Sequence, residues 1–569
     1  MRCLFSAGYR GGLACLALSA LLAGCGADRT VYRGGPVLTM DGESRVVEAL
    51  GVEGDRIGAV GDEGDVRAWA GRGARVVELR GHALLPGFID AHGHFPGEGV
   101  WASVVDLRSP PMAEVENLDD LVGRLRARAT KTNPGDWVVG MGYDDTLLAE
   151  GRHPTRRDLD RASSEHPIAV IHVSGHLASL NSAGLRAAGI DASTPDPEGG
   201  LIRREAGSRE PDGVLEEEAM VPIEARVLAP SPLESWRIVR EAIRRYLAAG
   251  VTTAQDGYAP KLQLRALGWL ARLGLLPLRV VVWPEPALAD EILAGSFSFD
   301  STDRVRVGAV KLIADGSIQG YTGYLSRPYH VPPGDDPSYR GYPRIPRGEL
   351  IERVAHYHAA GLQVAVHGNG DAAIDDILDA FEEAQRRHPR ADARPVVVHA
   401  QMARMDQLDR MRDLGVVPSF FSLHTFYWGD RHRRRFMGPE RAARMSPAAS
   451  AAKRGIRFTI HCDAPVVPME PMRLVWSAVN RRTRSGYVVG PDERISALQA
   501  LRAITIDAAW QGFEEAEKGS LEPGKLADLV VLDRNPLAID PLELDDIHVL
   551  ETIVGGRTEF QKKTGTFVE

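Results

Sequence analysis

Two histidines follow a short apolar run near the start of the chain. The stretch LLPGFIDAHGHF at 84–95 places His92 and His94 two residues apart, directly after Phe88 and Ile89. Residues two apart on an extended backbone point to the same side, so both imidazoles would face one centre. Imidazole nitrogens are favoured ligands of zinc and similar first-row ions. The pair is therefore a candidate for part of a metal site that other segments must complete.

More polar side chains stand at the ends of later apolar runs. They are Lys311 and Asp315 in VRVGAVKLIADG, His367 in LQVAVHG, His399 in RPVVVHA and Asp463 in IRFTIHCDAP. Burying each of these groups without a partner would cost roughly several kcal/mol, and a shared cation would give them all one. Each residue also has a plainer explanation on its own, as a hydrogen-bonded core histidine or as a salt bridge between Lys311 and Asp315.

The elements that must position these groups alternate between short β-branched runs and amphipathic helical stretches. This alternation is typical of a parallel sheet with crossover helices. Eight runs are expected to be strands, namely 87–94, 251–257, 278–283, 305–316, 362–368, 394–400, 415–421 and 456–465. A helix is predicted to begin at Ser231-Pro232 and to end at Gly250. The pattern predicts an α/β fold with a (β/α)8 barrel, whose active-site groups sit at the carboxyl ends of the strands.

The two ends of the chain differ from its middle in sequence pattern. Residues 30–87 and 518–569 contain short β-like pieces with Gly and Asp turns, so we expect them to pair as a small β-sandwich domain. Residues 88–517 would form the barrel domain. Residues 95–230 do not follow the alternation of strands and helices, and they contain the strand-like pieces WVVGMGYD and PIAVIHVSGH. We therefore predict an insertion after the first barrel strand that folds over the barrel mouth.

The first residues have the features of a secretory signal. Arg2 and Arg10 precede an apolar segment that is too short to span a bilayer and ends at Cys25. Leu22-Ala23-Gly24-Cys25 resembles a bacterial lipobox, which implies removal of residues 1–24, a lipid on Cys25 and a membrane-anchored protein in the cell envelope. An ordinary signal peptide with an incidental cysteine is the alternative. Cys462 would then be the one thiol left in the mature chain, so no disulfide framework is expected.

The composition and net charge of the chain limit the kinds of partner that we expect it to bind. The chain has 569 residues, 44% hydrophobic and 25% charged, with a formal net charge of −9. A negative net charge argues against nucleic acid as the main partner. We expect a small-molecule substrate, and we also consider a homodimer.

Ordered motifs run through residues 30–560, nearly the whole mature chain. They are GFIDAHGH, GVTTAQDG, GAVKLIADGS, GLQVAVHGNGDAAID, VVHAQ and DAPV, followed by ISALQALRAITIDAA and GSLEPGKLADLVVLD. The set resembles the amidohydrolase superfamily, in particular its branch of enzymes of the N-substituted formamide deformylase type (amidohydrolase family 3). The resemblance implies a metal-dependent hydrolase with a (β/α)8 barrel flanked by a small β-sandwich.

The resemblance also implies roles for single residues. His92, His94 and Asp463 would bind one ion, His367 and His399 a second, and a carboxylated Lys311 would bridge the two zinc ions. One ion held by the same histidines is the alternative. The metal lowers the pKa of a bound water, and Asp463 accepts the proton of that water and returns it to the leaving nitrogen.

Further residues are expected to face the substrate. The resemblance suggests His176 and Asn181 in VSGHLASLNS, and the motif GMGYDD adds Tyr143. The run SFFSLHTFYWGD adds His424 and Trp428 near the barrel mouth. His461 stands where relatives commonly carry a small residue, and strand alternation puts it on the side of Asp463. By the same alternation Cys462 should point away and pack in the core.

The combined prediction is an enzyme that hydrolyses a non-peptide C–N bond in an amide, an N-substituted formamide or a cyclic amide. A metal-dependent esterase, lactonase or phosphotriesterase on the same barrel is the first alternative. A lipid-anchored binding protein without catalysis is the second. No G-x-S-x-G motif is present, which argues against a covalent serine nucleophile.

Overall fold

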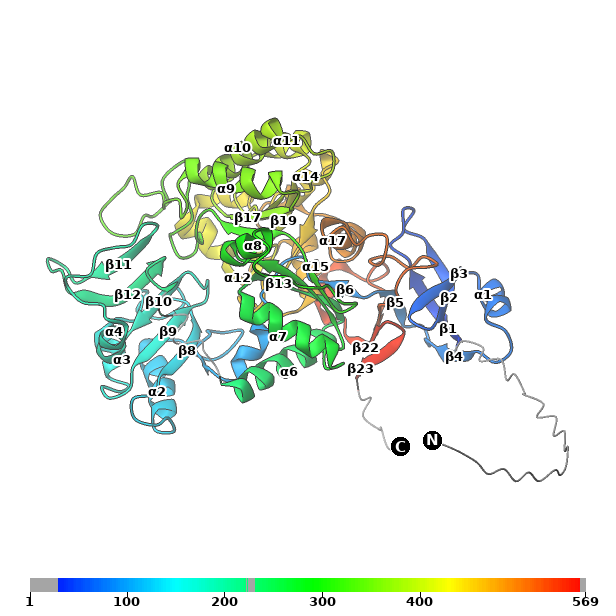
Figure 1. The fold of residues 1–569 in the computed structure, drawn as a ribbon, viewed down its shortest axis with the longest axis horizontal. Helices are drawn as coiled ribbons and strands as arrows, with labels where there is room; N and C mark the ends of the chain where they lie inside the picture. Colours follow the sequence, from blue (N-terminus) through cyan, green and yellow to red (C-terminus); the bar gives the residue numbers. More distant parts are fainter. Residues whose placement is uncertain (1–28, 222, 224–230, 563–569) are drawn as a thin grey trace, which may run out of the picture.

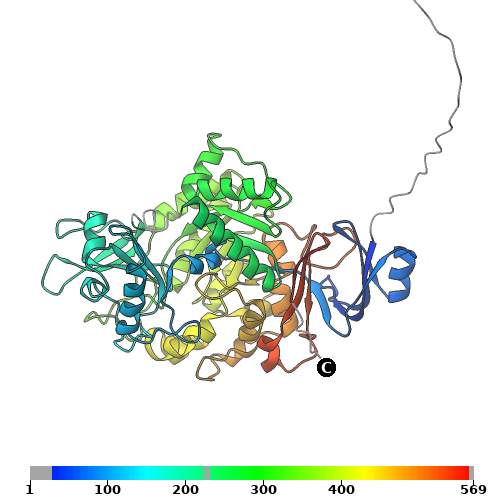
Figure 2. The same cartoon turned by 90° about the horizontal axis from the view of Figure 1, so that it is seen from below.

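The computed structural model describes residues 29–221, 223 and 231–562. The predicted signal segment 1–24 and the predicted lipid site at Cys25 lie outside these residues. Three assemblies follow one another across the molecule (Figure 1, Figure 2). A sheet built from both chain ends lies at one end, parallel strands with helices occupy the middle, and the sheet of the insertion lies at the other end.

Each of the eight expected strand runs contains a strand, and all of these strands pair in parallel. Their bounds are β6 Phe88–Ile89, β13 Val251–Ala259, β14 Arg279–Pro284, β15 Val305–Val307, β16 Val310–Ile313, β17 Val364–Gly368, β18 Val396–His399, β19 Val417–Phe420 and β20 Thr459–Ile460. The strands fall into two sheets, of order β15-β14-β13-β6 and β16-β17-β18-β19-β20.

The expected closed barrel ladder is not found among the described residues. The run 305–313 divides into β15 and β16 at Gly308 and Ala309, because Gly308 N still bonds to Val282 O whereas Val310 N bonds to Gln363 O. At the other seam, loop hydrogen bonds replace the ladder: His94 N donates to Ala464 O at 2.8 Å. The eight runs are therefore linked in sequence order by the two sheets and by the run 305–313, which pairs with both of them. Hydrogen bonds of His94 N with Ala464 O and of Asp463 N with His92 O join the first run to the last.

Helices connect the strands and follow the last one. Their bounds are α6 Pro232–Ala248, α7 Lys261–Arg272, α8 Pro286–Leu293, α9 Arg347–Ala359, α10 Asp371–Arg387, α11 Met405–Leu414, α12 His424–Arg431, α13 Gly438–Ala443, α14 Ala448–Lys453, α15 Pro471–Asn480, α16 Ala497–Ala503 and α17 Ile506–Gln511. The helix predicted from Ser231 is α6. It begins with a capping box, in which Ser231 N donates to the Glu234 carboxylate and Glu234 N to Ser231 Oγ.

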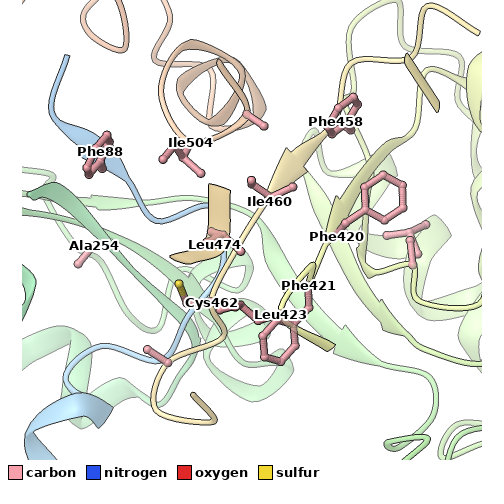
Figure 3. Close-up of a cluster of buried hydrophobic side chains, with 14 of the residues drawn as sticks. Phe88, Ala254, Phe420, Phe421, Leu423, Phe458, Ile460, Cys462, Leu474 and Ile504 are labelled. Atoms are coloured by element: carbon pink, nitrogen blue, oxygen red, sulfur yellow. The ribbon is translucent and has the colours of Figure 1, made fainter. Parts of the chain in front are cut away.

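The core between the strands and these helices is apolar. Phe420 and Ile460 lie on neighbouring strands, and Phe458 packs against Phe420 with ring centroids 5.8 Å apart (Figure 3). Cys462 belongs to the same buried cluster, so the prediction that its thiol packs in the core is confirmed.

The terminal segments pair with each other in one eight-stranded sheet. Its strands are β1 Arg29–Leu38, β2 Val46–Glu53, β3 Arg56–Gly61, β4 Arg75–Glu78, β5 Ala83–Pro86, β21 Leu529–Leu532, β22 Val549–Val554 and β23 Arg557–Gln561. Antiparallel pairing of β5 with β21 joins the two chain ends, and helix α1 (Glu63–Ala70) sets Trp69 against the sheet at Gly51 and Gly58. One continuous sheet does not confirm the expected β-sandwich.

The insertion contains a second mixed sheet, of order β11-β12-β10-β9-β8-β7. Its elements are β7 Val105–Asp106, α2 Leu118–Ala129, β8 Val138–Tyr143, α3 Arg156–Asp160, β9 Ile168–His172, β10 Leu177–Leu180, α4 Ser182–Ala188, β11 Gly200–Arg204 and β12 Pro211–Glu217. The sequence patterns indicated only β8 and β9. Over the residues that the structure describes, no helix combines the length and the apolar character that crossing a membrane requires.

Candidate metal centre

Strand register brings the predicted polar residues to one edge of the parallel sheets. His367 on β17 pairs with Ile313 on β16, and His399 ends β18 opposite Gly368. His399 in turn pairs with Phe420 on β19. Because carboxyl ends of parallel strands share an edge, the side chains from these distant segments meet there.

Four of the residues form the first half of the centre. His92 Nε2 lies 3.0 Å from Lys311 Nζ and 3.5 Å from Asp463 Oδ1. The same carboxylate oxygen lies 3.5 Å from Nε2 of His94. His92 is fully buried, whereas the His94 side chain is 39% exposed, so the centre opens to solvent on the side of His94.

Two histidines form the second half. His367 Nδ1 lies 3.1 Å from His399 Nε2, and the other oxygen of Asp463 lies 4.0 Å from that same nitrogen. On the far side of its ring, His367 Nε2 is 3.2 Å from the carbonyl of Gly316. All six residues predicted as ligands thus lie in one continuous cluster.

Neighbours outside the predicted set hold His92 in place. His92 Nδ1 lies 3.0 Å from Gln255 Oε1, an acceptor, so Nδ1 carries the proton and Nε2 is left bare toward Lys311 and Asp463. The His92 ring also stacks on Trp283 with centroids 5.4 Å apart. Gln255 could have been suspected as a polar residue within the apolar run VTTAQDG, but Trp283 carries no such signal.

The backbone is strained at two residues of the cluster. His399 has φ +70° and Asp463 has φ +55°, backbone angles that residues other than glycine rarely adopt. Such conformations persist where the surrounding fold holds them, and they gather at functional sites. Here they turn both side chains toward the common centre beyond the strand ends.

Burial controls the protonation of the cluster. It lowers the pKa of His92, His367 and His399 well below the usual value for histidine. It also lowers the pKa of Lys311 to about 7. Burial raises the pKa of Asp463, but the surrounding histidines outweigh it and hold that carboxyl ionised.

The donor set fits a divalent cation. His92, His399 and Asp463 each offer a ligand atom within 4.8 Å of one another, and Asp463 Oδ1 is buried without a hydrogen-bond partner. Two nitrogens bound to one zinc ion at ~2.0–2.1 Å lie roughly 3 Å apart, which matches the 3.1 Å between His367 and His399. Neutral imidazoles beside an ionised carboxylate are the ligands that zinc prefers.

One predicted substrate residue reaches the cluster from the insertion. The ring of His176 meets that of His367 edge-on with centroids 5.1 Å apart. The fully buried Glu217, at the end of β12, accepts a hydrogen bond from His176 Nδ1 at 2.8 Å and lies 3.5 Å from Arg344 Nη1. Sequence reasoning missed Glu217, because nothing in the run PDGVLEEEA distinguishes it from the two glutamates beside it.

Three other predicted residues line the same region. His461 Nε2 lies 3.1 Å from His399 Nδ1. His424, at the start of α12, has its ring centroid 6.2 Å from that of His399, and Trp428 lies one turn further along the helix, 5.7 Å from His424. Burial lowers the pKa of His424 and of His461 to about 3, so both are neutral near pH 7.

Two predicted substrate residues form hydrogen bonds within the insertion. The Asn181 side chain accepts from the backbone of Ile168 and Gly184 and donates to two carbonyls, so its amide is saturated while it caps α4. Tyr143 bonds to His153 and Ser179 within the insertion. The resemblance suggested Asn181 and the motif GMGYDD suggested Tyr143, and neither shows which neighbouring groups bond to these side chains. The saturated amide corrects Asn181 to a structural role, and the substrate role of Tyr143 stays a prediction.

A second polar cluster lies in the insertion at the end of β8. Asp144, Asp145 and His172 are buried and hold ligand atoms within 4.8 Å of one another. Asp145 Oδ1 is 3.2 Å from His172 Nε2, and Asp144 already accepts bonds from Trp428 and Arg431. Through these contacts the cluster joins the insertion to α12.

Comparisons with known proteins agree with this geometry. The model of the amidohydrolase family matches residues 75–560. An N-substituted formamide deformylase of Arthrobacter pascens is 30% identical over 92% of this chain and 97% of its own length. A putative amidohydrolase of Bacillus subtilis is 27% identical over 94% of this chain and all of its own length. An uncharacterised metal-dependent hydrolase of Pyrococcus horikoshii superposes with a TM-score of 0.72 at 25% identity, over 90% of this chain and 99% of that one.

Proposed function

Because the chain belongs to the amidohydrolase family of metal-dependent hydrolases, with a TIM-barrel-like α/β fold, we propose that it hydrolyses a non-peptide C–N bond. The substrate class is an amide, an N-substituted formamide or a cyclic amide. The observation that carries the proposal is the buried set of neutral imidazoles around Asp463, whose Oδ1 atom has no partner of its own. The name of the relative from Arthrobacter pascens supports the choice of bond.

The proposal assigns ligands to the cluster. His92, His94 and Asp463 hold one divalent cation, zinc in our proposal, and His367 and His399 hold a second. Bound cations of this kind supply Lewis acidity, which activates water and polarises a carbonyl. Lys311 bridges the two halves as a carbamate, formed when its neutral amine adds CO₂ and releases a proton. A pKa lowered to about 7 by burial supports this step, because the amine is then largely neutral near physiological pH.

Asp463 is the proposed general base and acid. Its carboxylate is ionised. Its Oδ1 atom lies 3.5 Å from Nε2 of His94, the cluster residue that is open to solvent. This oxygen can take a proton from the attacking water and return it to the leaving nitrogen, which needs that proton to depart as an amine.

The surrounding side chains would bind and orient the substrate. His176, His424, Trp428 and His461 are assigned to this role. His176 is placed to accept a hydrogen bond from the substrate, because its Nδ1 donates to Glu217 and leaves a bare Nε2 on the other side of the ring. His424 and Trp428 offer ring faces beside Phe421.

Metal analysis and a substrate panel test the proposal together. The purified protein is loaded with zinc, its metal content is measured, and N-substituted formamides, cyclic amides, esters, lactones and phosphotriesters are assayed. We expect at least one tightly held ion per chain, turnover of C–N substrates and loss of that turnover in Asp463→Asn. Faster turnover of esters than of any amide would favour the esterase alternative. Binding without turnover by a metal-loaded protein would favour a non-catalytic role.

One further proposal and one further measurement concern the whole protein. The lipobox-like residues before Cys25 support a lipid anchor and a place in the cell envelope. Expression of Cys25→Ser in a bacterial host should release the protein from the membrane fraction. Light scattering of the protein without residues 1–25 would measure its mass and show whether it forms the homodimer considered above.

A further inference from the structure

A chain of buried hydrogen bonds runs from the metal centre to the end of α17. It passes from His399 through His461, Ser419 and Thr459 to Gln511. All five side chains are buried. The imidazoles and hydroxyls of the chain can each donate or accept, so the direction of the whole chain depends on which end is fixed.

The fixed end is the amide of Gln511. Its Nε2 atom donates to the carbonyl of Ala91 at 2.9 Å, and a main-chain carbonyl can only accept. The amide therefore cannot be reversed, and Oε1 is the atom that faces Thr459 Oγ1 at 2.7 Å. An amide oxygen only accepts, so the hydroxyl hydrogen of Thr459 must point to Gln511.

This choice sets the next two links. Thr459 Oγ1 also lies 2.8 Å from Ser419 Oγ, a distance at which either hydroxyl could be the donor. Because the one hydrogen of Thr459 is already given to Gln511, we infer that the hydrogen of this link comes from Ser419. Ser419 Oγ is then an acceptor for the ring nitrogen 2.9 Å away, Nδ1 of His461. His461 therefore carries its hydrogen on Nδ1.

The last link determines the state of His399. A neutral imidazole with its hydrogen on Nδ1 has a bare Nε2, so His461 Nε2 accepts from His399 Nδ1 at 3.1 Å. His399 is left with an unprotonated Nε2, the atom that lies 3.1 Å from His367 Nδ1 and 4.0 Å from Asp463 Oδ2. Reversing the chain would leave the buried Oε1 of Gln511 without a hydrogen bond, which is unfavourable.

We propose that Gln511, Thr459, Ser419 and His461 form a one-directional hydrogen-bond chain that holds Nε2 of His399 ready to bind the cation. In this chain the four are positioning residues, because its hydrogen bonds reach the proposed cation through His399. The inference rests on the proposed function in one respect, that His399 is a ligand. Partners behind metal-binding histidines typically change metal affinity by roughly 10–100-fold when they are lost.

Paired substitutions test the chain at Thr459. Thr459→Val removes the hydroxyl and keeps the shape, whereas Thr459→Ser keeps the hydroxyl. Zinc affinity of the metal-free protein is measured by competition with a chromophoric chelator, and unfolding curves establish that both variants fold. We expect Thr459→Val to bind zinc at least about tenfold more weakly than Thr459→Ser, which should match the unchanged protein. Equal affinities for the two variants would overturn the proposal.

A second measurement follows the tautomer without any metal. Nitrogen-15 spectra of histidine-labelled, metal-free protein distinguish protonated from bare ring nitrogens, and His399→Asn identifies the signals of His399. We expect a protonated Nδ1 and a bare Nε2 in the unchanged protein and a mixture of tautomers in Ser419→Ala, with Ser419→Thr as the control. A protonated Nε2 in the unchanged protein would refute the chain. Failure to bind zinc with the expected tautomer intact would refute the proposed function and leave the chain standing.

Discussion

The carboxylate of Asp144, at the end of β8 in the insertion, accepts a hydrogen bond from Trp428 Nε1 of α12 at 3.0 Å. Arg431, one turn further along α12, donates to the same oxygen at 2.7 Å. Residues 284 positions apart in the chain are thus joined beside His424. The contact fixes where the insertion lies against the helix that carries the proposed substrate residues.

Removing the indole donor should loosen this tie. Trp428→Phe keeps an aromatic ring and leaves the buried carboxylate with one donor fewer, which should lower the free energy of unfolding by about 1.5–3 kcal/mol. We also expect a raised KM and faster hydrogen exchange in β8. The matched control is Trp476→Phe, because Trp476 Nε1 donates to the neutral carbonyl of Leu542 at 3.1 Å. A loss no larger than that of the control would contradict the prediction.

A methyl group at Gly257 should displace His92. A Cβ atom built there would lie 2.3 Å from Cε1 of the His92 ring, so Gly257→Ala must push the imidazole out of place. We expect zinc affinity to fall by a factor of ten or more while the protein still folds, as measured by chelator competition and circular dichroism. Gly123→Ala on α2 is the control, since no atom lies within 4 Å of its added Cβ. Unchanged zinc affinity in Gly257→Ala would show that His92 is not a ligand.

Glu98 should make the protein less stable as pH rises. Burial raises the pKa of Glu98 from 4.5 to about 6, and Arg245 at 3.4 Å offsets only part of this shift. Between these two values the folded state binds more protons than the unfolded state, so stability falls as pH increases through this window. Relative to the unchanged protein, Glu98→Gln should therefore gain about 2 kcal/mol in free energy of unfolding above pH 6, and nothing below pH 4.5.

Urea unfolding at pH 4 to 8 checks this dependence on Glu98. Glu241→Gln on α6 provides a control of opposite sign. Hydrogen bonds from Arg244 lower the pKa of Glu241 to about 2, so that substitution should lose stability as pH rises through the normal glutamate range. A Glu98→Gln variant that is less stable than the unchanged protein at pH 7 would refute the prediction.

Zinc should stabilise the fold through the histidine cluster. A cation that binds only the folded state adds about 2.7 kcal/mol at a concentration one hundred times its Kd, so Tm should fall on treatment with a chelator and recover with zinc. This response should become smaller in His367→Ala, which removes one proposed ligand of the second ion. It should persist in His358→Ala, whose buried ring bonds to the carbonyl of His388 on the outer helices. Calorimetry with and without zinc measures the difference, and a full zinc response in His367→Ala would exclude that residue as a ligand.

Sequence periodicity and residue type were enough to locate the centre. His92, His367, His399 and Asp463 each stand at the end of an apolar run, and parallel strands bring such ends to a single edge of the sheet. The same reasoning placed Cys462 in the core, because alternation along a strand is a local property. These results needed no knowledge of which helices or loops cover the strands.

Tertiary structure decided what depends on partners far away in the chain. The break between β15 and β16 arises because Gly308 and Val310 bond to different neighbouring strands. The role of Asn181 was set by main-chain groups, which form hydrogen bonds with both the oxygen and the nitrogen of its side-chain amide. The tautomer of His399 depends on Gln511, more than a hundred residues later, and on the carbonyl of Ala91. A hydrogen bond has a direction only when both of its partners are known, and only the folded chain brings these partners together.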